Sequence, residues 1–482
     1  MSEKVFKNAS HYILASLLPI AVSVLMLPIY TLYLSPTDYG ILALVLSLQA
    51  FLPILMTLQI QGSIPRFYFE YCDDKAKLKV FISTILLFVV ILSTVAVFFL
   101  STYLDEILDL IFPKTIGYND IFVLGVWSSY LTVFSSLFIN IIRVQQRSML
   151  FMKASLSLFF ISLIIQIFEV VVYERGAYGV VEATLISTLL SLIVYATIVR
   201  EFFIFKFNLK IIIEPMKYSL PLIPHALSGL IFMYSDRIIL EKSVTLLIIG
   251  LYMFSDKIAM VFKTIVNEFN NSFSPYFNER SKQSKSIAVT ETQNISLVFI
   301  YVVAMSVIVL SLFSVEVVYF LFDERYFETW RMIPLLSSAY VFRSLYCFSS
   351  SGLFYEKMTG KVAIITIVSG LVNIALNLWL IPLYGVIAAI YTTIFSFLLT
   401  FIMAEIMSYK IFYLHLDLAK IFSIVGFMFV AILFSISLNE NFFVFGYIEY
   451  SYKIVVISIG VFMGYKMKII DANWLLKVKG VL

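Results

Sequence analysis

The sequence is poor in charged residues. Asp, Glu, Lys and Arg make up 13% of its 482 residues, and 61% of the residues are hydrophobic. A soluble domain carries about 25% charged residues, and so few charges could not cover the surface of a soluble protein of this length. Lipid must therefore be the solvent for much of the chain. The net charge of +4 is also too small to indicate a nucleic acid as a partner.

Cysteines and enzyme motifs are scarce as well. The only two cysteines, Cys72 and Cys347, lie far apart and match no metal-binding or redox spacing. The sequence lacks a Gly-rich phosphate-binding loop, a zinc-ligand spacing and a nucleophile elbow. These absences predict a protein with no resident metal, no cofactor and no enzymatic activity.

Long apolar runs dominate the chain instead. A helix needs about 20 mostly apolar residues to cross a bilayer, and fourteen runs meet this length approximately. We therefore expect an all-α, polytopic membrane protein. Every connection between the runs is short, and the longest, about 268–293, is polar. The runs are 12–34, 41–63, 80–103, 121–142, 154–173, 178–199, 217–240, 245–267, 294–322, 332–354, 361–381, 385–408, 420–438 and 453–467.

The distribution of lysine and arginine predicts the orientation, because cytoplasmic loops carry an excess of both. With a cytoplasmic N-terminus, 25 of the 34 lysines and arginines lie in inner segments. The outer segments hold seven, among them Arg237 and Lys453, and Lys257 and Arg343 fall inside helices. We therefore expect both termini to be cytoplasmic and the number of helices to be even.

The chain also contains a repeat. Four landmarks recur at offsets of 205–210 residues: Gly179 with Gly385, Lys153 with Lys361, Gly40 with Gly250, and Pro19 with Pro224. They predict two six-helix halves, 1–207 and 208–415, related by an axis along the membrane normal. Two extra helices and a cytoplasmic tail would occupy 416–482.

Motifs within the first 408 residues resemble those of a known family. They are Leu34-Ser35-Pro36-Thr37-Asp38-Tyr39-Gly40, Tyr218-Ser219-Leu220-Pro221-Leu222-Ile223-Pro224 with Ser235-Asp236-Arg237, Gly250-Leu251-Tyr252 with Lys257, and Asn373-Ile374-Ala375-Leu376-Asn377 with Ile381-Pro382-Leu383-Tyr384-Gly385. In this order and at this spacing, the chain resembles the polysaccharide transporter group of the multidrug/oligosaccharidyl-lipid/polysaccharide (MOP) exporter superfamily, and in particular Wzx-type O-antigen flippases.

The resemblance implies a function in surface polysaccharide synthesis. Such a flippase moves undecaprenyl-pyrophosphate-linked oligosaccharide, a repeat unit of O-antigen or another polysaccharide, from the cytoplasmic to the periplasmic leaflet of the bacterial inner membrane by alternating access. The expected partners are this lipid-linked oligosaccharide, H+ or Na+ as a coupling ion, and a polysaccharide polymerase and a chain-length regulator protein.

Two other functions stay open at this point. A multidrug cation antiporter of the same superfamily would need acidic residues in its cavity, whereas Lys257 and Arg343 favour an anionic substrate. A membrane polysaccharide polymerase would need a large outer loop for its chemistry, and the sequence predicts none.

Arg343 is the strongest candidate for a substrate contact. It lies in the middle of the run 332–354, where an arginine is unfavourable by about 2.5–3.5 kcal/mol, and it shares a helical face with Tyr340. The pyrophosphate of a lipid-linked sugar would offset this cost. The alternative is an ion pair with Asp256 or Glu316.

Further candidates come from charged residues near the runs and from polar stripes along them. The other candidates for substrate binding are Lys257, Arg66, Arg143, Asn140, Asn373, Asn377 and Arg237, and those for ion coupling are Asp256, Glu169 and Asp236. Asp236 and Arg237 alternatively form a local pair. The stripes are Ser129, Thr132, Ser136, Asn140 and Arg143, then Ser162, Gln166 and Glu169, and later Thr366, Ser369, Asn373 and Asn377. Such stripes either line a cavity or hold helices together by hydrogen bonds.

Overall fold

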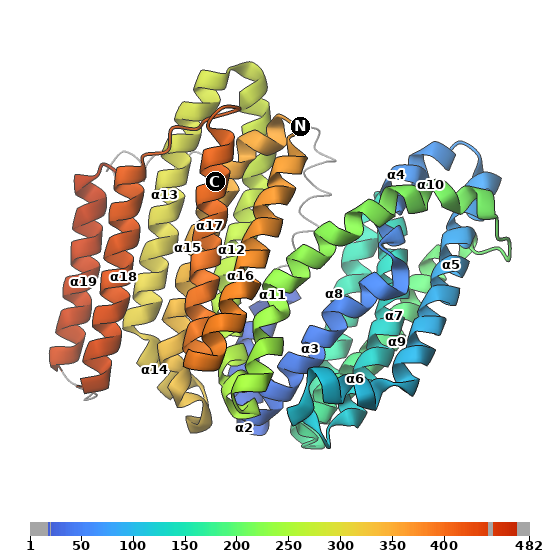
Figure 1. Ribbon diagram of the computed structural model, residues 1–482, viewed down its shortest axis with the longest axis horizontal. Coiled ribbons are helices and arrows are strands. Elements are labelled where there is room, and N and C mark those ends of the chain that lie inside the picture. The colour runs from blue at the N-terminus through green and yellow to red at the C-terminus, as the bar shows by residue number, and fades with distance from the viewer. Residues whose placement is uncertain (1–17, 20, 442–446, 470–482) are drawn as a thin grey trace. The chain divides into compact units, whose positions relative to one another are not determined.

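The computed structural model describes residues 18–469 apart from residue 20 and residues 442–446. Helices make up the regular structure of this part of the chain, which contains no β-strand. The chain divides into two compact units, Met1–Gly250 and Leu251–Leu482, and Figure 1 labels the helices of each.

The first unit is built around α7, which packs against α9, α3 and α5, while α8 packs against α9. The first turn of α12 also belongs to this unit. The bounds are α2 Leu27–Tyr33, α3 Pro36–Thr57, α4 Ile64–Tyr71, α5 Lys75–Thr102, α6 Leu104–Ile111, α7 Asn119–Val144, α8 Ser148–Ile167, α9 Gly176–Val199, α10 Leu209–Ser219 and α11 Ile223–Ser243.

The second unit is built around α15, which packs against α17 and α13, while α16 packs against α17. The two last helices, α18 and α19, pack on α13. The bounds are α12 Leu246–Gln283, α13 Lys285–Leu312, α14 Ser314–Leu321, α15 Met332–Tyr355, α16 Thr359–Tyr384, α17 Val386–Ser408, α18 Leu418–Asn441 and α19 Tyr447–Lys466.

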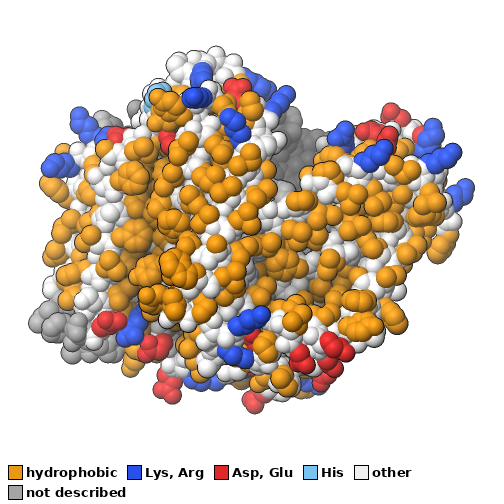
Figure 2. Space-filling model, viewed as in Figure 1, with side chains coloured by type: hydrophobic (Ala, Val, Ile, Leu, Met, Phe, Trp, Pro, Cys, Tyr) orange, Lys and Arg blue, Asp and Glu red, His pale blue; other side chains and the backbone are white. Residues whose placement is uncertain are grey.

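Hydrophobic side chains cover the middle of the helices in each unit, and charged side chains gather toward the helix ends (Figure 2). Many large hydrophobic side chains are more than half exposed, for example Phe98, Leu378 and Phe462. A soluble protein rarely exposes so large an apolar surface, whereas lipid-facing helices require one.

The expectation of an all-α, polytopic membrane protein is confirmed. Nine helices in the described part of the chain are long and apolar enough to cross a membrane: α3, α5, α7, α8 with its continuation to Val172, α9, α13, α16, α17 and α18. The other predicted runs also fall on helices, namely α2, α10 with α11, α12, α15 and α19. Part of the first run, 12–17 and 20, lies outside the described residues, as does the predicted tail from residue 470.

The segment 268–293 differs from its prediction as a connection. α12 continues to Gln283 and α13 starts at Lys285, so the two helices form a hairpin that extends past the other helices of their unit (Figure 1). α12 has 38 residues, about 57 Å at 1.5 Å per residue, which exceeds a hydrocarbon core of about 30 Å. The Tyr276 hydroxyl donates to Glu291 at 2.7 Å across the hairpin. This polar contact thus joins the two helices of the hairpin.

Ser35 and Asp38, from the motif at the start of α3, hold the N-terminal ends of two helices together. Ser35 caps α3 and forms a capping box with Asp38, in which each side chain accepts the backbone N–H of the other residue. Asp38 Oδ1 also accepts the N–H of Ala177 at 3.0 Å, at the start of α9. One aspartate therefore fixes the start of α3 against the start of α9.

Gly40 and Gly250 allow α3 and the first turn of α12 to cross in close contact. A Cβ atom on Gly40 would overlap the carbonyl oxygen of Leu246, and one on Gly250 would overlap the carbonyl oxygen of Pro36. The packing requires glycine at both positions because the obstructing atoms belong to the backbone. These are two glycines that the sequence repeat pairs, and the six-helix repeat itself stays a prediction.

Candidate functional site

Arg343 lies midway along α15, and its guanidinium reaches two neighbouring helices. Nη2 donates to Asn267 Oδ1 on α12 at 3.1 Å, and Cζ lies 5.9 Å from the ring centroid of Phe397 on α17. The ring of Tyr340, which is buried one turn earlier on α15, lies 6.0 Å from the ring of Phe397. These four residues form the arginine cluster.

Arg343 forms no ion pair with a carboxylate in the described part of the chain. Its Nε is buried without a hydrogen-bond partner, and the guanidinium keeps further N–H groups for an acceptor. Glu316, one of the partners that the sequence suggests, is paired with Lys453 instead. A guanidinium with unused donors inside a helical unit is suited to bind phosphate oxygens.

Lys257 and Asp256 are both half-buried on α12. Asn267, the hydrogen-bond partner of Arg343, lies ten residues further along the same helix, about 15 Å at 1.5 Å per residue. The backbone positions of Lys257 and Asn267 are therefore about three helical turns apart. That Lys257 and Arg343 line one cavity stays a prediction.

Asn373 and Asn377 use their amides to connect α16 to α17. Asn373 Nδ2 donates to Ser396 Oγ at 3.0 Å, Asn377 Nδ2 donates to Asn373 Oδ1 at 3.1 Å, and Thr392 donates to Asn377 Oδ1. Both asparagines are almost fully buried. Of the two interpretations of this stripe, the hydrogen bonds favour helix association.

Glu169 lies in a π-helical turn, Phe168–Val172, that follows α8. It is buried, and its Oε2 accepts a hydrogen bond from Arg175 Nη1 at 3.2 Å. Arg175 also pairs with Glu182 on α9. The helical spacing around Glu169 does not predict this pair, because Arg175 lies in the loop between α8 and α9. The ion pair gives Glu169 a structural role as an alternative to ion coupling.

Arg66 and Arg143 are exposed cations of the first unit. Arg66 lies in the first turn of the short helix α4, and its Cζ is 5.0 Å from the ring centroid of Tyr218. Arg143 lies in the last turn of α7, three residues after the half-buried Asn140, with Cζ 5.0 Å from the ring centroid of Phe151. Both guanidinium groups lie over aromatic rings at helix ends.

Asp236 and Arg237 are both buried on α11. Asp236 Oδ1 accepts the backbone N–H of Arg237 at 2.8 Å, and Arg237 Nη1 donates to the carbonyl of Met233 at 3.2 Å. The Arg237 guanidinium carbon lies 5.2 Å from the ring centroid of Tyr234. These three contacts lie within α11, and the Asp236 carboxylate meets the backbone N–H of Arg237.

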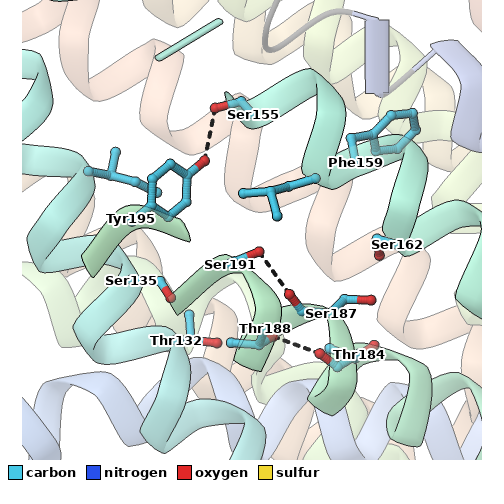
Figure 3. A pocket seen from close by; sticks show the side chains of 12 residues that line it. Thr132, Ser135, Ser155, Phe159, Ser162, Thr184, Ser187, Thr188, Ser191 and Tyr195 are labelled. Carbon is cyan, nitrogen blue, oxygen red and sulfur yellow. Dashed lines mark hydrogen bonds between the residues drawn. The ribbon is translucent and has the colours of Figure 1, made fainter. Parts of the chain in front are cut away.

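A cavity of about 330 Å³ lies between α7, α8 and α9 in the first unit (Figure 3). Thr132 and Ser162, from two of the predicted polar stripes, both line it. The sequence analysis missed the contribution of α9, whose hydroxyl groups repeat every three or four residues. The lining residues are Thr132, Ser135, Ile139, Ser155, Leu158, Phe159, Ser162, Thr184, Ser187, Thr188, Ser191 and Tyr195.

Glu405 is a half-buried carboxylate on α17 that the sequence analysis missed. Its Oε2 accepts a hydrogen bond from Ser349 Oγ at 2.7 Å, and its Oε1 has no hydrogen-bond partner. It lines a second cavity, of about 420 Å³, together with Lys361 and Lys410. The only sequence signal for it is a single acid near the end of an otherwise apolar run.

These features define a polytopic helical membrane protein with polar sites inside its helical units. Its fold is that of the MOP transporters. The structure of the lipid II flippase MurJ in the inward closed conformation matches with a TM-score of 0.71 at 14% identity, over 96% of this chain and 100% of that chain. An inward-facing multidrug resistance MATE family transporter of the MOP superfamily matches with a TM-score of 0.61 at 13% identity, over 84% and 95%. Matches at these identities establish the fold alone.

The family follows from the sequence itself. The family of polysaccharide biosynthesis proteins matches residues 5–281, more than half of the chain, and the chain therefore belongs to this family. The resemblance inferred from the motifs is thereby confirmed. No curated protein matches the chain in sequence.

Proposed function

We propose that this protein is a flippase that moves undecaprenyl-pyrophosphate-linked oligosaccharide, the repeat unit of a surface polysaccharide such as O-antigen, across the bacterial inner membrane. Arg343 carries the proposal, because it is a half-buried cation in a membrane helix with donors that no described carboxylate uses. Membership of the polysaccharide biosynthesis family supports the sugar part of the substrate.

The proposed role of the arginine cluster is to replace water around the pyrophosphate. A bare anion is very costly in a medium of low dielectric constant, and a guanidinium can donate two parallel hydrogen bonds to phosphate oxygens. Asn267 and Phe397 hold the guanidinium in place on two sides. Lys257, Arg66 and Arg143 are proposed as further contacts on the path of the headgroup, and Asp256 and Asp236 as sites for a coupling H+ or Na+.

The proposed orientation places both termini and the tip of the α12–α13 hairpin in the cytoplasm. The tip is rich in lysine and arginine, with Arg280, Lys282 and Lys285 around the break at Ser284, as expected for a cytoplasmic segment. A reporter fused after Lys282 should give a cytoplasmic signal. A periplasmic signal would overturn the orientation and the parallel repeat with it.

Deletion of the gene in its own bacterium tests the function. Sugar-bearing undecaprenyl pyrophosphate should accumulate on the cytoplasmic leaflet, and surface polysaccharide should be lost and then restored by the wild-type gene. The measurement is mass spectrometry of extracted lipids together with surface glycan staining.

The second candidate is a multidrug cation antiporter, because one of the structures that share this fold is a multidrug resistance MATE family transporter. The half-buried cation Arg343 argues against it, because a cationic substrate would be repelled. Unchanged surface polysaccharide with increased sensitivity to cationic dyes after deletion would support this candidate instead.

A further inference from the structure

The cavity between α7, α8 and α9 is lined by hydroxyl groups from three helices. On α9, Thr184 and Ser191 each lie three or four residues from both Ser187 and Thr188, which places these four residues on one helical face. Ser155 and Ser162 on α8 and Thr132 on α7 line the same space (Figure 3). The three faces come from separate segments of the chain, so their convergence is a property of the fold.

No Asp, Glu, Lys or Arg lines this cavity. Its apolar and aromatic lining includes Ile139, Leu158 and Phe159, and Tyr195 contributes both a ring and a hydroxyl group. An ionic ligand would find no counter-charge here, and a purely apolar lipid tail would leave the buried Ser187 hydroxyl group without a hydrogen-bond partner. The chemistry of the lining is that of a site for an uncharged, polar ligand.

Most of the hydroxyl groups that line the cavity donate a hydrogen bond within the protein, but their oxygens can still accept one from a ligand. Thr188 Oγ1 donates to the carbonyl of Thr184 at 2.7 Å, and Ser191 Oγ donates to the carbonyl of Ser187 at 2.8 Å. Each of these oxygens retains lone pairs for a ligand hydroxyl. Ser and Thr side chains in membrane helices commonly donate to the carbonyl of the preceding turn in this way.

Ser187 departs from that arrangement. The residue is 9% exposed, and its Oγ has no hydrogen-bond partner. Buried polar atoms are nearly always satisfied, and this one lies in the wall of the cavity. A ligand in the cavity would complete its hydrogen bonding.

We propose that the cavity between α7, α8 and α9 binds uncharged sugar residues of the lipid-linked glycan, which rests on the proposed function. Sugar hydroxyl groups both donate and accept, so they match a wall of Ser, Thr and Tyr hydroxyl groups, and the faces of sugar rings pack on aromatic side chains. A cavity of about 330 Å³ lies at the lower end of the range for small-molecule sites, which suits a short part of the glycan. Under this proposal the cavity is the sugar-binding site of the first unit.

The test measures the affinity of the full-length protein in lipid nanodiscs for two probes. One is undecaprenyl pyrophosphate without sugar, and the other is the sugar-bearing lipid extracted from the deletion strain. Ser187→Ala should weaken binding of the sugar-bearing lipid by about twofold to tenfold, the value of one hydrogen bond. Ser187→Leu, which fills the cavity, should weaken it further. Neither variant should change the affinity for the sugar-free lipid.

Thr197→Ala is the matched control, because Thr197 lies on α9, is exposed and does not line the cavity. Ser187→Ala removes no hydrogen bond from the protein, so it keeps the test decisive if Ser187→Leu fails to fold. Unchanged affinity of Ser187→Ala for the sugar-bearing lipid would overturn the role of the cavity and leave the proposed function standing. Failure of the wild-type protein to bind either lipid would overturn the proposed function and this inference together.

Discussion

Replacing Arg343 with alanine should abolish glycan export while the protein still folds and inserts at its normal level. The guanidinium makes one hydrogen bond, to Asn267, and no ion pair with a described carboxylate. Its removal therefore leaves no buried counter-charge behind, which is the usual cause of severe destabilisation. Export should fall by about a hundredfold, equivalent to roughly 3 kcal/mol for a lost buried charge contact. The measurement is surface polysaccharide per unit of membrane-inserted protein in the deletion strain.

Two further variants sharpen this experiment. Arg343→Lys should restore export only in part, because an ammonium group cannot make the two parallel hydrogen bonds of a guanidinium. Arg331→Ala is the matched control. Arg331 is an exposed arginine of the same unit, paired with Glu328 and Glu440 at 3.5 and 3.3 Å, and exposed pairs contribute little. Normal export by a stable Arg343→Ala protein would contradict the role assigned to the arginine.

Hydropathy was sufficient to locate the helices, because a bilayer forces each spanning segment to be long, apolar and helical. It was not sufficient for the segment 268–293. Outside the lipid, a polar sequence is compatible with either a loop or a helix, and side-chain contacts such as that between Tyr276 and Glu291 decide. The start of the last helix was also misjudged from the sequence. The charge distribution counted Lys453 among the outer segments. α19 starts at Tyr447, so Lys453 lies inside a helix and is fully buried.

Polar stripes predicted that certain residues face protein rather than lipid, but one helix does not reveal what it faces. Asn373 and Asn377 meet Thr392 and Ser396 and are used in helix packing. Thr132 instead meets a cavity completed by hydroxyl groups of α9. Arg343 could be singled out because a charge in mid-span is costly. Its contact with Phe397 depends on how α15 and α17 pack, which spacing along one helix does not encode.

Replacing Lys453 with methionine should strongly destabilise the second unit. Lys453 on α19 is paired with Glu316 in the first turn of α14, and both side chains are buried. Without the lysine, a carboxylate stays buried with no counter-charge, and breaking such pairs from one side costs about 3–5 kcal/mol. The methionine itself fills a similar volume against Phe313, whose ring centroid lies 5.1 Å from Lys453 Nζ. Thermal unfolding of the purified protein in detergent measures the effect.

The double variant Lys453→Met, Glu316→Gln separates the charge from the packing. It removes both ions at once, so most of the lost stability should return, since buried ion pairs are often no more stabilising than neutral residues of the same size. Lys420→Met provides the reference for an exposed pair. Lys420 and Asp417 lie 3.1 Å apart with both side chains at least 40% exposed, and this substitution should cost less than about 1 kcal/mol. A double variant as unstable as Lys453→Met alone would mean that lysine packing, rather than the buried charge pair, holds α19 to α14.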